Sequence, residues 1–290
     1  MISIPEKEST NFKGPGRLPY FDVLLMRLDQ GRRDLDLAFG RHVHWGYWEN
    51  PKKADGSPED FARAAEALSQ KVWRAALLKD GMSVLDAGCG FGGTLASLNE
   101  NFSRMELVGL NIDRRQLERA RGKWVEREGN TLQLQQGDAC EMPFANGLFD
   151  AVLAVECIFH FPSREAFFRE AWRVLKPGGV LAISDFVPQR FLRLFCASRQ
   201  AKRMMEPFFG ICRMDHTLAD YRRLGREAGF VSVWEEDIAP NTAPTYPFLR
   251  RIQKDLTGED SWNKLGNVAG EWMSRFNWMR YMILAFQKLD

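Results

Sequence analysis

The first two thirds of the chain alternate between two spacings of apolar residues, one typical of strands and one typical of helices. Short apolar runs predict strands at 84–87, 107–111, 132–136, 149–155 and 180–184. Apolar residues at helical spacing predict helices at 18–40 and 58–78, from about 94, and at 114–126 and 165–175. Strands and helices that follow one another in this way favour an α/β fold with a doubly wound, mostly parallel sheet.

The pattern changes after Pro188. The residues that follow are largely of helical spacing and rich in Phe, Met and Arg, and two later apolar segments, 231–235 and 281–288, are typical of strands. We therefore expect four parts. They are an N-terminal tail and helical cap (1–57), a strand–helix core (58–188), a helical lid inserted after the fifth strand (189–228), and C-terminal strands that complete the sheet (229–290).

Composition and charge exclude some classes of function. The 290 residues are 45% hydrophobic and 27% charged, which suits a sizeable core. The formal net charge of +2 is spread along the chain, so we expect no nucleic-acid partner. No apolar run approaches the roughly 20 residues that cross a bilayer, so we expect no membrane partner and a cytoplasmic location. Five cysteines without C-x-x-C spacing are expected to be free thiols: Cys89, Cys140, Cys157, Cys196 and Cys212.

A glycine-rich segment follows the first predicted strand. Residues 84–93 read VLDAGCGFGG, in which Gly88, Gly90 and Gly93 spell the G-x-G-x-x-G pattern of dinucleotide-binding turns. A dinucleotide would bring its phosphates next to the carboxylate of Asp86, which would repel them. S-adenosylmethionine has no phosphate, and its ammonium and sulfonium groups are positively charged. Asp86 therefore favours S-adenosylmethionine over the nicotinamide cofactor of a dehydrogenase, which is the alternative.

VLDAGCGFGG resembles the first motif of class I S-adenosylmethionine-dependent methyltransferases, and LVGLNIDRRQLERAR, GDACEMPF, FDAVLAVE and LKPGGVLAISDF resemble later motifs in the same order. The resemblance covers roughly residues 60–188. It implies a seven-stranded Rossmann-like fold, with S-adenosyl-L-methionine as methyl donor and S-adenosyl-L-homocysteine as product. The residues that it places against the donor are Asp86, Gly88, Cys89, Gly90, Asn111, Ile112, Gln116, Asp138, Ala139 and Val155.

The second strand departs from the family pattern at its last residue. Related enzymes commonly have Asp or Glu there to hold the ribose hydroxyls, whereas this chain has Asn111. An amide can accept from one hydroxyl and donate to another without a charge. Gln116 lies where related cyclopropane-forming and natural-product methyltransferases use a glutamine, so we expect Asn111 and Gln116 to share the ribose. The alternative is that Gln116 is a solvated helix residue.

The N-terminal segment HWGYW resembles the H-x-G-Y-W segment found in sugar and polyketide O-methyltransferases and in tocopherol-type and sterol C-methyltransferases. The resemblance implies that Tyr47 covers the cofactor and that Trp48 contacts the substrate. Both aromatic rings would lie near the sulfonium of the cofactor, because aromatic faces attract cations. The alternative is that both side chains only fix the N-terminal helix to the core.

His160, in VECIFHFP, is the candidate general base. It follows the fourth strand, at the sheet edge where α/β folds bind ligands, and an imidazole can accept a hydroxyl proton at neutral pH. Asp185 ends the neighbouring fifth strand and is expected to orient the imidazole, an arrangement similar to that of antibiotic-sugar O-methyltransferases. The alternative is that His160 caps the following helix and Asp185 bonds a backbone turn. The histidines and cysteines have no spacing typical of zinc ligands, so no metal is expected.

Glu156 offers a different chemistry. In C-methyltransferases that act on alkenes, a carboxylate in this region stabilises a carbocation or removes a proton, so C-methylation of a prenyl or polyketide acceptor is the alternative reaction. Glu156 could equally support the cofactor pocket through hydrogen bonds to its loop.

The predicted lid is rich in flexible apolar residues, which suit an apolar acceptor. Met205, Phe208 and Phe209 are the candidate substrate contacts there, although such residues are often ordinary core. Interleaved basic residues could contact a diphosphate or an acidic carrier protein, or simply form a solvated face: Arg190, Arg193, Arg199, Lys202 and Arg203. The sequence thus predicts methyl transfer to a hydroxyl of a natural-product-like small molecule. A non-catalytic cofactor-binding protein is a further alternative.

Overall fold

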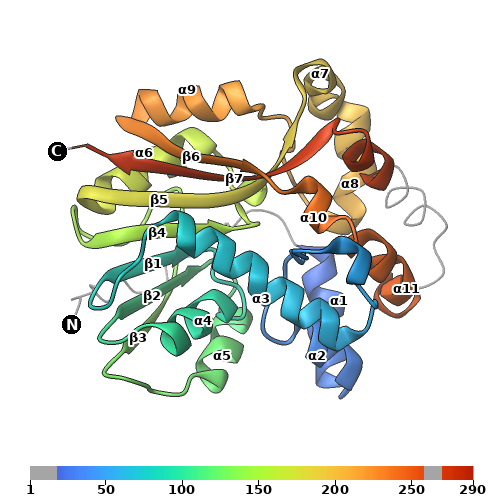
Figure 1. The fold of residues 1–290 in the computed structure, drawn as a ribbon, viewed down its shortest axis with the longest axis horizontal. Helices are drawn as coiled ribbons and strands as arrows, with labels where there is room; N and C mark the ends of the chain where they lie inside the picture. The colour runs from blue at the N-terminus through green and yellow to red at the C-terminus, as the bar shows by residue number, and fades with distance from the viewer. Residues whose placement is uncertain (1–17, 258–269, 290) are drawn as a thin grey trace.

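The computed structural model describes residues 18–257 and 270–289, and within them one sheet has a hydrophobic core on each of its two faces. Its strand order is β3-β2-β1-β4-β5-β7-β6 (Figure 1). The strands are β1 Ser83–Ala87, β2 Glu106–Asn111, β3 Thr131–Gln136, β4 Phe149–Val155, β5 Leu175–Pro188, β6 Phe230–Asp237 and β7 Met279–Lys288. Of these, only β7 runs antiparallel to its neighbours. The expected seven-stranded, mostly parallel sheet is confirmed.

The apolar runs of the central strands have a simple explanation: both faces of the sheet are covered. Along β4, alternate side chains enter two different cores. Leu153 packs on one face with α3 (Pro58–Ala75) and α4 (Gly93–Asn101), whereas Val152 packs on the other face with α6 (Arg164–Val174) and α9 (Leu218–Ala228). α5 (Arg114–Lys123) lies on the same face as α4. A parallel sheet buried on both faces requires such continuous apolar strands.

β5 is longer than the predicted strand at 180–184. It pairs with β4 from Leu175 onward, but the pairing shifts in register before Val180. The turn residues between these two positions, Lys176–Gly179, are accommodated by that irregularity instead of ending the strand. The far end of β5 extends to Pro188 because β7 pairs with it that far.

The N-terminal cap differs from the single helix predicted at 18–40. It consists of α1 (Pro19–Asp29) and α2 (Arg33–Phe39), separated by a break at which Gly31 has a φ of +76°. A positive φ cannot continue a right-handed helix, and glycine adopts it without strain. Each helix then turns its own apolar residues toward a shared core.

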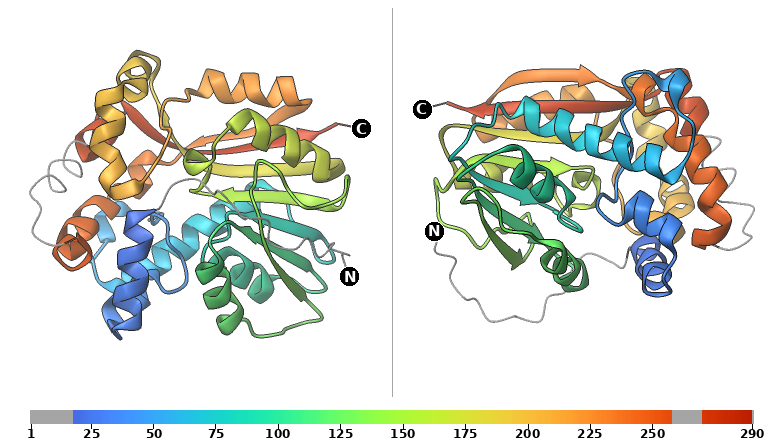
Figure 2. Two further views of the ribbon diagram at one scale, coloured as in Figure 1. Left: turned by 180° about the vertical axis from the view of Figure 1, so that it is seen from behind. Right: turned by 60° about the horizontal axis from the view of Figure 1, so that its bottom comes forward.

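That shared core joins distant parts of the chain. Phe21 of α1 and Phe61 of α3 pack in it with Phe248 of α11 (Thr245–Thr257), and the rings of Phe61 and Phe248 stack with centroids 4.2 Å apart. Figure 2 shows α1, α2 and α11 grouped beside the carboxyl end of the sheet. The cap over this end is therefore built from both N-terminal and C-terminal residues.

The segment after β5 forms η3 (Arg190–Leu192), α7 (Arg193–Ala197) and α8 (Arg199–Phe209), and α8 lies against α1. α9 belongs to the sheet layer instead, because its Tyr221 and Leu224 pack in the same core as α6. A short helix, α10 (Ala239–Thr242), and a 3-10 turn, η1 (Pro51–Lys53), complete the connections. None of the described helices combines the length and apolar character needed to cross a bilayer.

Candidate active site

A pocket lies at the carboxyl ends of β1, β2 and β4, and residues of α1 and residues 41–44 also line it. All the residues that the sequence placed against the methyl donor, except Tyr47, line it: Asp86, Gly88, Cys89, Gly90, Asn111, Ile112, Gln116, Asp138, Ala139 and Val155. Glu156 and His160 line it as well. The pocket thus brings the predicted binding residues and two candidate catalytic residues together.

The glycine turn at the end of β1 is packed too closely for larger residues. Gly88 has a φ of +88°, and a Cβ there would lie 2.7 Å from the Sγ of Cys157. Gly93, the first residue of α4, would place a Cβ 2.4 Å from the carbonyl oxygen of Arg41. Both glycines allow neighbouring loops to approach the turn directly, which shapes the pocket floor.

Asp86 is the acidic residue of this floor. Its side chain is only 2% exposed, and burial raises its pKa to about 7. Among the hydrogen bonds of the described residues, none is donated to its carboxyl group. A buried carboxyl without a partner favours a cation in the adjoining pocket, because the charge of such a ligand would offset its desolvation.

Asn111 and Gln116 are joined at the end of β2. Nδ2 of Asn111 donates to Oε1 of Gln116 over 3.1 Å and lies 3.3 Å from the carbonyl oxygen of Asp113. Both side chains are buried, so the alternative that Gln116 is a solvated helix residue is wrong. Both residues line the pocket, and the pairing leaves the Asn111 oxygen and the Gln116 amino group available as one acceptor and one donor.

Asp138 is held on the next loop. Its Oδ1 accepts from the backbone N–H of Cys140 over 2.7 Å, which fixes the carboxylate while it lines the pocket. The remaining oxygen can accept a hydrogen bond from a ligand amine.

His160 lies on the 3-10 turn η2 (Ile158–His160) after β4, where both ring nitrogens have neighbours. Nδ1 is 3.4 Å from the carbonyl oxygen of Ile211, and Nε2 is 3.3 Å from the hydroxyl of Tyr20. A carbonyl can only accept, so the ring proton belongs on Nδ1 and the lone pair of Nε2 faces the pocket. Burial lowers the pKa of His160 to about 4, which keeps the ring neutral near pH 7.

Tyr20 was not predicted as a site residue. It comes from α1, its ring stacks on that of His160 with centroids 6.0 Å apart, and burial raises the pKa of its hydroxyl well above the usual value. The hydroxyl therefore stays protonated and donates to His160. Nothing local in the sequence marks Tyr20, because the helical spacing there reports only that α1 has an apolar face.

Asp185 does not orient His160, contrary to the sequence-based expectation. It is fully buried and accepts from Nη2 of Arg164 over 2.8 Å, from the hydroxyl of Tyr221 and from the backbone N–H of Phe186. Arg164 is itself 1% exposed, so a buried carboxylate and a buried guanidinium neutralise each other. Asp185 therefore connects β5 to α6 and α9, and the imidazole of His160 is held by Tyr20 and Ile211 instead.

Glu156 stands at the end of β4 with a φ of +51°, a strained conformation for a residue other than glycine. Oε2 accepts from the backbone N–H of Trp45 over 3.0 Å and from the hydroxyl of Tyr281. Burial raises the pKa of Glu156 to about 8 despite these two donors. The carboxyl group therefore titrates near neutral pH while it lines the pocket.

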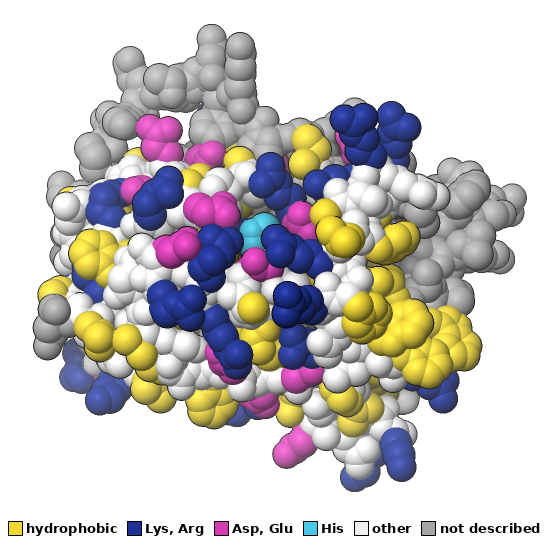
Figure 3. Space-filling view, turned by 90° about the horizontal axis from the view of Figure 1, so that it is seen from above, with side chains coloured by type: hydrophobic (Ala, Val, Ile, Leu, Met, Phe, Trp, Pro, Cys, Tyr) yellow, Lys and Arg dark blue, Asp and Glu magenta, His cyan; other side chains and the backbone are white. Residues whose placement is uncertain are grey.

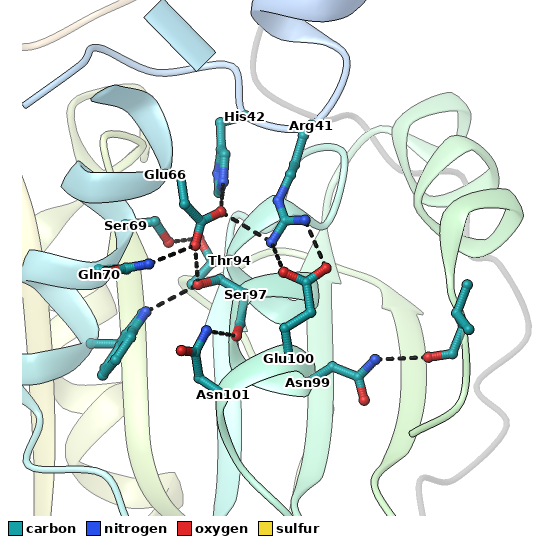
Figure 4. Close-up of polar contacts among 12 residues, drawn as sticks. Arg41, His42, Glu66, Ser69, Gln70, Thr94, Ser97, Asn99, Glu100 and Asn101 are labelled. Carbon is teal, nitrogen blue, oxygen red and sulfur yellow. Dashed lines mark hydrogen bonds and ion pairs between the residues drawn. The ribbon is translucent and has the colours of Figure 1, made fainter. Parts of the chain in front are cut away.

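The wall formed by residues 41–44 is anchored by an ionic network (Figure 4). Arg41 donates two hydrogen bonds of 2.8 Å to Glu100, and Nη2 of Arg41 lies 3.0 Å from Glu66. His42 also reaches Glu66 over 2.8 Å. Burial alone would raise the pKa of Glu66, but the hydrogen bonds from His42 and Ser97 lower this pKa to about 2. The network fixes the wall to α3 and α4.

The two aromatic residues predicted around the sulfonium face elsewhere. Nε1 of Trp48 donates to Asp60 over 2.7 Å, and its buried ring packs in the cap core. The ring of Tyr47 lies beneath the ammonium group of Lys71, 5.2 Å from its centroid. Neither lines the pocket. The contacts of Tyr47 and Trp48 agree with the alternative that these residues fix the N-terminal segment to the core.

The predicted lid contacts have different positions. Met205 packs partly buried against the core cluster of α3 and α4, and Phe209 is half exposed with its ring 6.1 Å from that of Tyr20. Neither lines the pocket, whereas Ile211, just after α8, does. The side chain of Phe208 lies outside the described residues.

Comparison with known proteins identifies the family. A family model described as a methyltransferase domain matches residues 85–183. The methyltransferase GfsG of Streptomyces halstedii is 33% identical over 223 residues, which make up 76% of this chain and 76% of that protein. The chain belongs to the class I S-adenosylmethionine-dependent methyltransferases. Membership sets aside the dehydrogenase alternative, and S-adenosylmethionine is the methyl donor of the family.

Other relatives of this methyltransferase have names that specify different methyl-accepting atoms. The O-methyltransferase resE of Aspergillus sclerotiorum is 28% identical over 218 residues, 75% of this chain and 79% of that protein. The sterol 24-C-methyltransferase erg6 of Aspergillus fumigatus is 42% identical over 211 residues, 70% of this chain but 54% of that protein. The methyltransferase therefore spans about half the length of the sterol enzyme. Oxygen and carbon acceptors both occur among these names.

Solved structures share the fold of the methyltransferase. Geranyl diphosphate C-methyltransferase from Streptomyces coelicolor is 19% identical with a TM-score of 0.71, covering 95% of this chain and 100% of that one. The mycolic acid cyclopropane synthase CmaA1 is 17% identical with a TM-score of 0.73, covering 94% and 99%. These matches confirm the predicted fold class.

Proposed function

We propose that this methyltransferase transfers a methyl group to a hydroxyl group of an apolar small molecule, with His160 as general base. The observation that carries the proposal is the Tyr20 hydroxyl, 3.3 Å from Nε2 of His160. A hydroxyl group already occupies the hydrogen-bonding position that an acceptor hydroxyl would need. The geometry is thus suited to the removal of a hydroxyl proton inside the pocket.

The state of His160 supports this role. The carbonyl oxygen of Ile211 fixes the Nδ1–H tautomer, so Nε2 can accept a proton from the acceptor. The low pKa keeps the base unprotonated before the reaction. Since Asp185 is committed to Arg164, the imidazolium formed by proton transfer has no direct carboxylate partner. A base with so low a pKa would release the proton readily after the transfer.

The residues of the pocket floor fit S-adenosylmethionine. The unpartnered carboxyl of Asp86 suits the ammonium group, the pair Asn111 and Gln116 suits the ribose hydroxyls, and Asp138 suits the adenine amine. Gly88 allows Cys157 to pack directly against the turn, which keeps the pocket floor in place beside Asp86. When bound, the donor supplies a methyl group on a positively charged sulfur, which is already a strong electrophile. The chain's tasks are then to hold both partners, exclude water and take up one proton.

The opposite wall of the pocket supports an apolar acceptor. It is formed by side chains with little polarity from α1 and from the loops after β4 and α8: Leu18, Tyr20, Phe21, Phe161 and Ile211. Such a wall holds an apolar body through burial, and His160 then provides the polar contact that fixes its orientation.

C-methylation of a prenyl or polyketide acceptor is the second candidate, and Glu156 is the observation that favours it. Its carboxyl group lines the pocket, is partly buried, and accepts hydrogen bonds from Trp45 and Tyr281, on a residue whose backbone is strained. A partly buried carboxyl on a strained backbone at a pocket is typical of a functional group, and once ionised it could stabilise a carbocation or remove a carbon-bound proton.

One experiment separates the two candidates. The purified protein is incubated with methyl-labelled S-adenosylmethionine and a panel of apolar alcohols, phenols and alkenes, and fragmentation mass spectrometry locates the label. We expect labelled methyl ethers that form in Glu156→Gln and are lost in His160→Ala. A label on carbon that is lost in Glu156→Gln and kept in His160→Ala would replace the first candidate by the second. Unchanged S-adenosylmethionine binding without label transfer to any class of acceptor would contradict both.

A further inference from the structure

Six large apolar side chains are exposed on two segments that do not line the pocket. Three of them lie on η3 and α7, and three lie on the segment 272–278. Each is between 45% and 83% exposed: Phe191, Leu194, Phe195, Trp272, Phe276 and Trp278. We call these residues the aromatic patch. None of them lines the pocket, so substrate binding there does not explain their exposure.

The patch is continuous across two segments that are distant in sequence. The ring of Phe191 meets that of Trp278 edge-on with centroids 5.8 Å apart, and Phe276 links Trp278 to Trp272. The backbone N–H of Gln189 donates to the carbonyl oxygen of Trp278 over 2.8 Å, which fixes the two segments side by side. Figure 3 shows hydrophobic side chains gathered on this side of the molecule. A contiguous exposed patch of this kind is typical of a binding surface.

Basic residues lie among and beside the patch residues, although Nη2 of Arg193 is also 3.8 Å from Oδ1 of Asp220. Residues 189–209 contain five Lys or Arg and one Glu, whereas the whole chain has a net charge of only +2. Arg190 and Arg193 are exposed and alternate with Phe191 and Leu194. The guanidinium of Arg275 lies over the ring of Trp272, 5.9 Å from its centroid. The partner of this surface must therefore accept apolar side chains and carry negative charge at the same place.

We infer that the aromatic patch docks the protein onto an anionic lipid membrane. Leu194 is 83% exposed, so it projects from the surface and can enter a lipid layer, whereas a protein partner of comparable fit would need a matching groove. Trp, Phe and Leu surrounded by Arg form the composition of segments that lie at the headgroup boundary. The sequence-based expectation of no membrane partner concerned spanning segments, and surface docking needs none. The inference does not depend on the acceptor proposed above.

The patch lies close to the pocket, so docking would bring the pocket near the membrane. α8 begins two residues after α7 and runs toward α1, and Ile211 just beyond its end lines the pocket. A helix of 11 residues is about 16 Å long, so the patch and the pocket lie at opposite ends of one short helix. An apolar acceptor dissolved in the docked membrane would therefore have a short path to the pocket.

The test is co-sedimentation of the full chain with vesicles. Vesicles of phosphatidylcholine and phosphatidylglycerol in equal parts are compared with vesicles of phosphatidylcholine alone. We expect binding to the mixed vesicles that weakens as salt is added, and little binding to the neutral ones. Leu194→Glu should weaken binding about tenfold or more, since it replaces an inserted apolar side chain by a charge that the lipid repels. Arg190→Gln should weaken it about fivefold.

Leu77→Glu is the matched control. Leu77 is 67% exposed just beyond the end of α3, so the same substitution leaves the patch untouched and vesicle binding unchanged. Both leucines are too exposed for either variant to unfold the protein, and circular dichroism checks this. Equal binding by Leu194→Glu and Leu77→Glu would contradict the inference, as would equal binding to neutral and anionic vesicles. So would an acidic carrier protein or a second copy of the chain that engages Leu194 while the mixed vesicles do not bind.

Discussion

The hydroxyl of Tyr20 lies 3.3 Å from Nε2 of His160, although 140 positions separate the two residues along the chain. This hydrogen bond joins the first helix of the cap to the loop that follows β4. When α1 covers the pocket, its Tyr20 also occupies the hydrogen-bonding position of the candidate base His160. An acceptor that brings its own hydroxyl to His160 must take the place of Tyr20.

His160→Ala and Tyr20→Phe are expected to act in different ways. Loss of the base should lower kcat about 10²- to 10⁴-fold at saturating S-adenosylmethionine, with unchanged donor affinity. Tyr20→Phe removes a competing hydroxyl but keeps the ring, so we expect an unchanged kcat and a lower KM for the acceptor. Steady-state kinetics measure both. A loss of kcat in Tyr20→Phe as large as that in His160→Ala would instead place the tyrosine in the path of the proton.

The affinity for S-adenosylmethionine should depend on pH through Asp86. With a pKa of about 7 in the free protein, the carboxyl is neutral in acid and must lose its proton to attract the ammonium group. Affinity should therefore rise about tenfold per pH unit up to about pH 7 and level off above it. Isothermal titration calorimetry from pH 5.5 to 8.5, about 1.5 units to either side of that pKa, measures this slope.

Two variants assign that slope. Asp86→Asn should bind weakly at every pH and show no rise attributable to this carboxyl. Glu156→Gln is the control, because the pKa of Glu156 is also raised, to about 8, by burial. If Asp86→Asn keeps the wild-type slope and Glu156→Gln abolishes it, the ammonium group is held by Glu156.

The pair of Arg164 and Asp185 should contribute to stability and not to the pH profile of catalysis. Both side chains are buried, so Arg164→Met leaves an uncompensated carboxylate and should cost about 3–5 kcal/mol of unfolding free energy. Arg114→Met breaks the exposed pair with Glu118 and should cost about 0.5 kcal/mol or less. Urea denaturation compares the two variants. Equal losses would mean that the buried pair is not what holds β5 to α6.

Two glycine substitutions should have opposite effects. A Cβ at Gly93 would lie 2.4 Å from the backbone oxygen of Arg41, so Gly93→Ala must displace the wall formed by residues 41–44. We expect a lower Tm and weaker S-adenosylmethionine binding. Gly122, within α5, has no atom within 4 Å of the corresponding Cβ, so Gly122→Ala should raise stability by about 0.5–1 kcal/mol. Thermal shift with and without the donor measures both effects, and an intact donor response in Gly93→Ala would show that the wall is dispensable.

Local sequence patterns predicted the core well because its signals are short-range. The strand at 149–155 has the bounds expected from its apolar run, since it is buried on both faces and Asp150 is its single polar residue. The glycine turn, Asn111 and Gln116 meet in one pocket because the ends of adjacent parallel strands always share an edge. The break at Gly31 was missed because helical spacing continues on both sides of it.

The pairing of catalytic groups was not predictable in the same way. His160 follows β4 and Asp185 lies within the neighbouring β5, but Arg164 and Tyr221 reach Asp185 from two helices. No local sequence pattern reports such long-range competition for a carboxylate. Likewise, Tyr20 reaches the pocket only because α1 folds over it, whereas Trp48 is drawn away by its hydrogen bond to Asp60. Contacts that depend on how cap helices pack were beyond the reach of sequence periodicity.

The place of β7 between β5 and β6 has a consequence for synthesis of the chain. β7 pairs with both neighbours over most of its length, yet it is the last of the three to leave the ribosome. Until residues 279–288 emerge, β5 has an open edge and β6 has no partner in the sheet. A premature stop before Met279 would leave two strands with unpaired backbone groups, the kind of intermediate that chaperones bind and that otherwise aggregates.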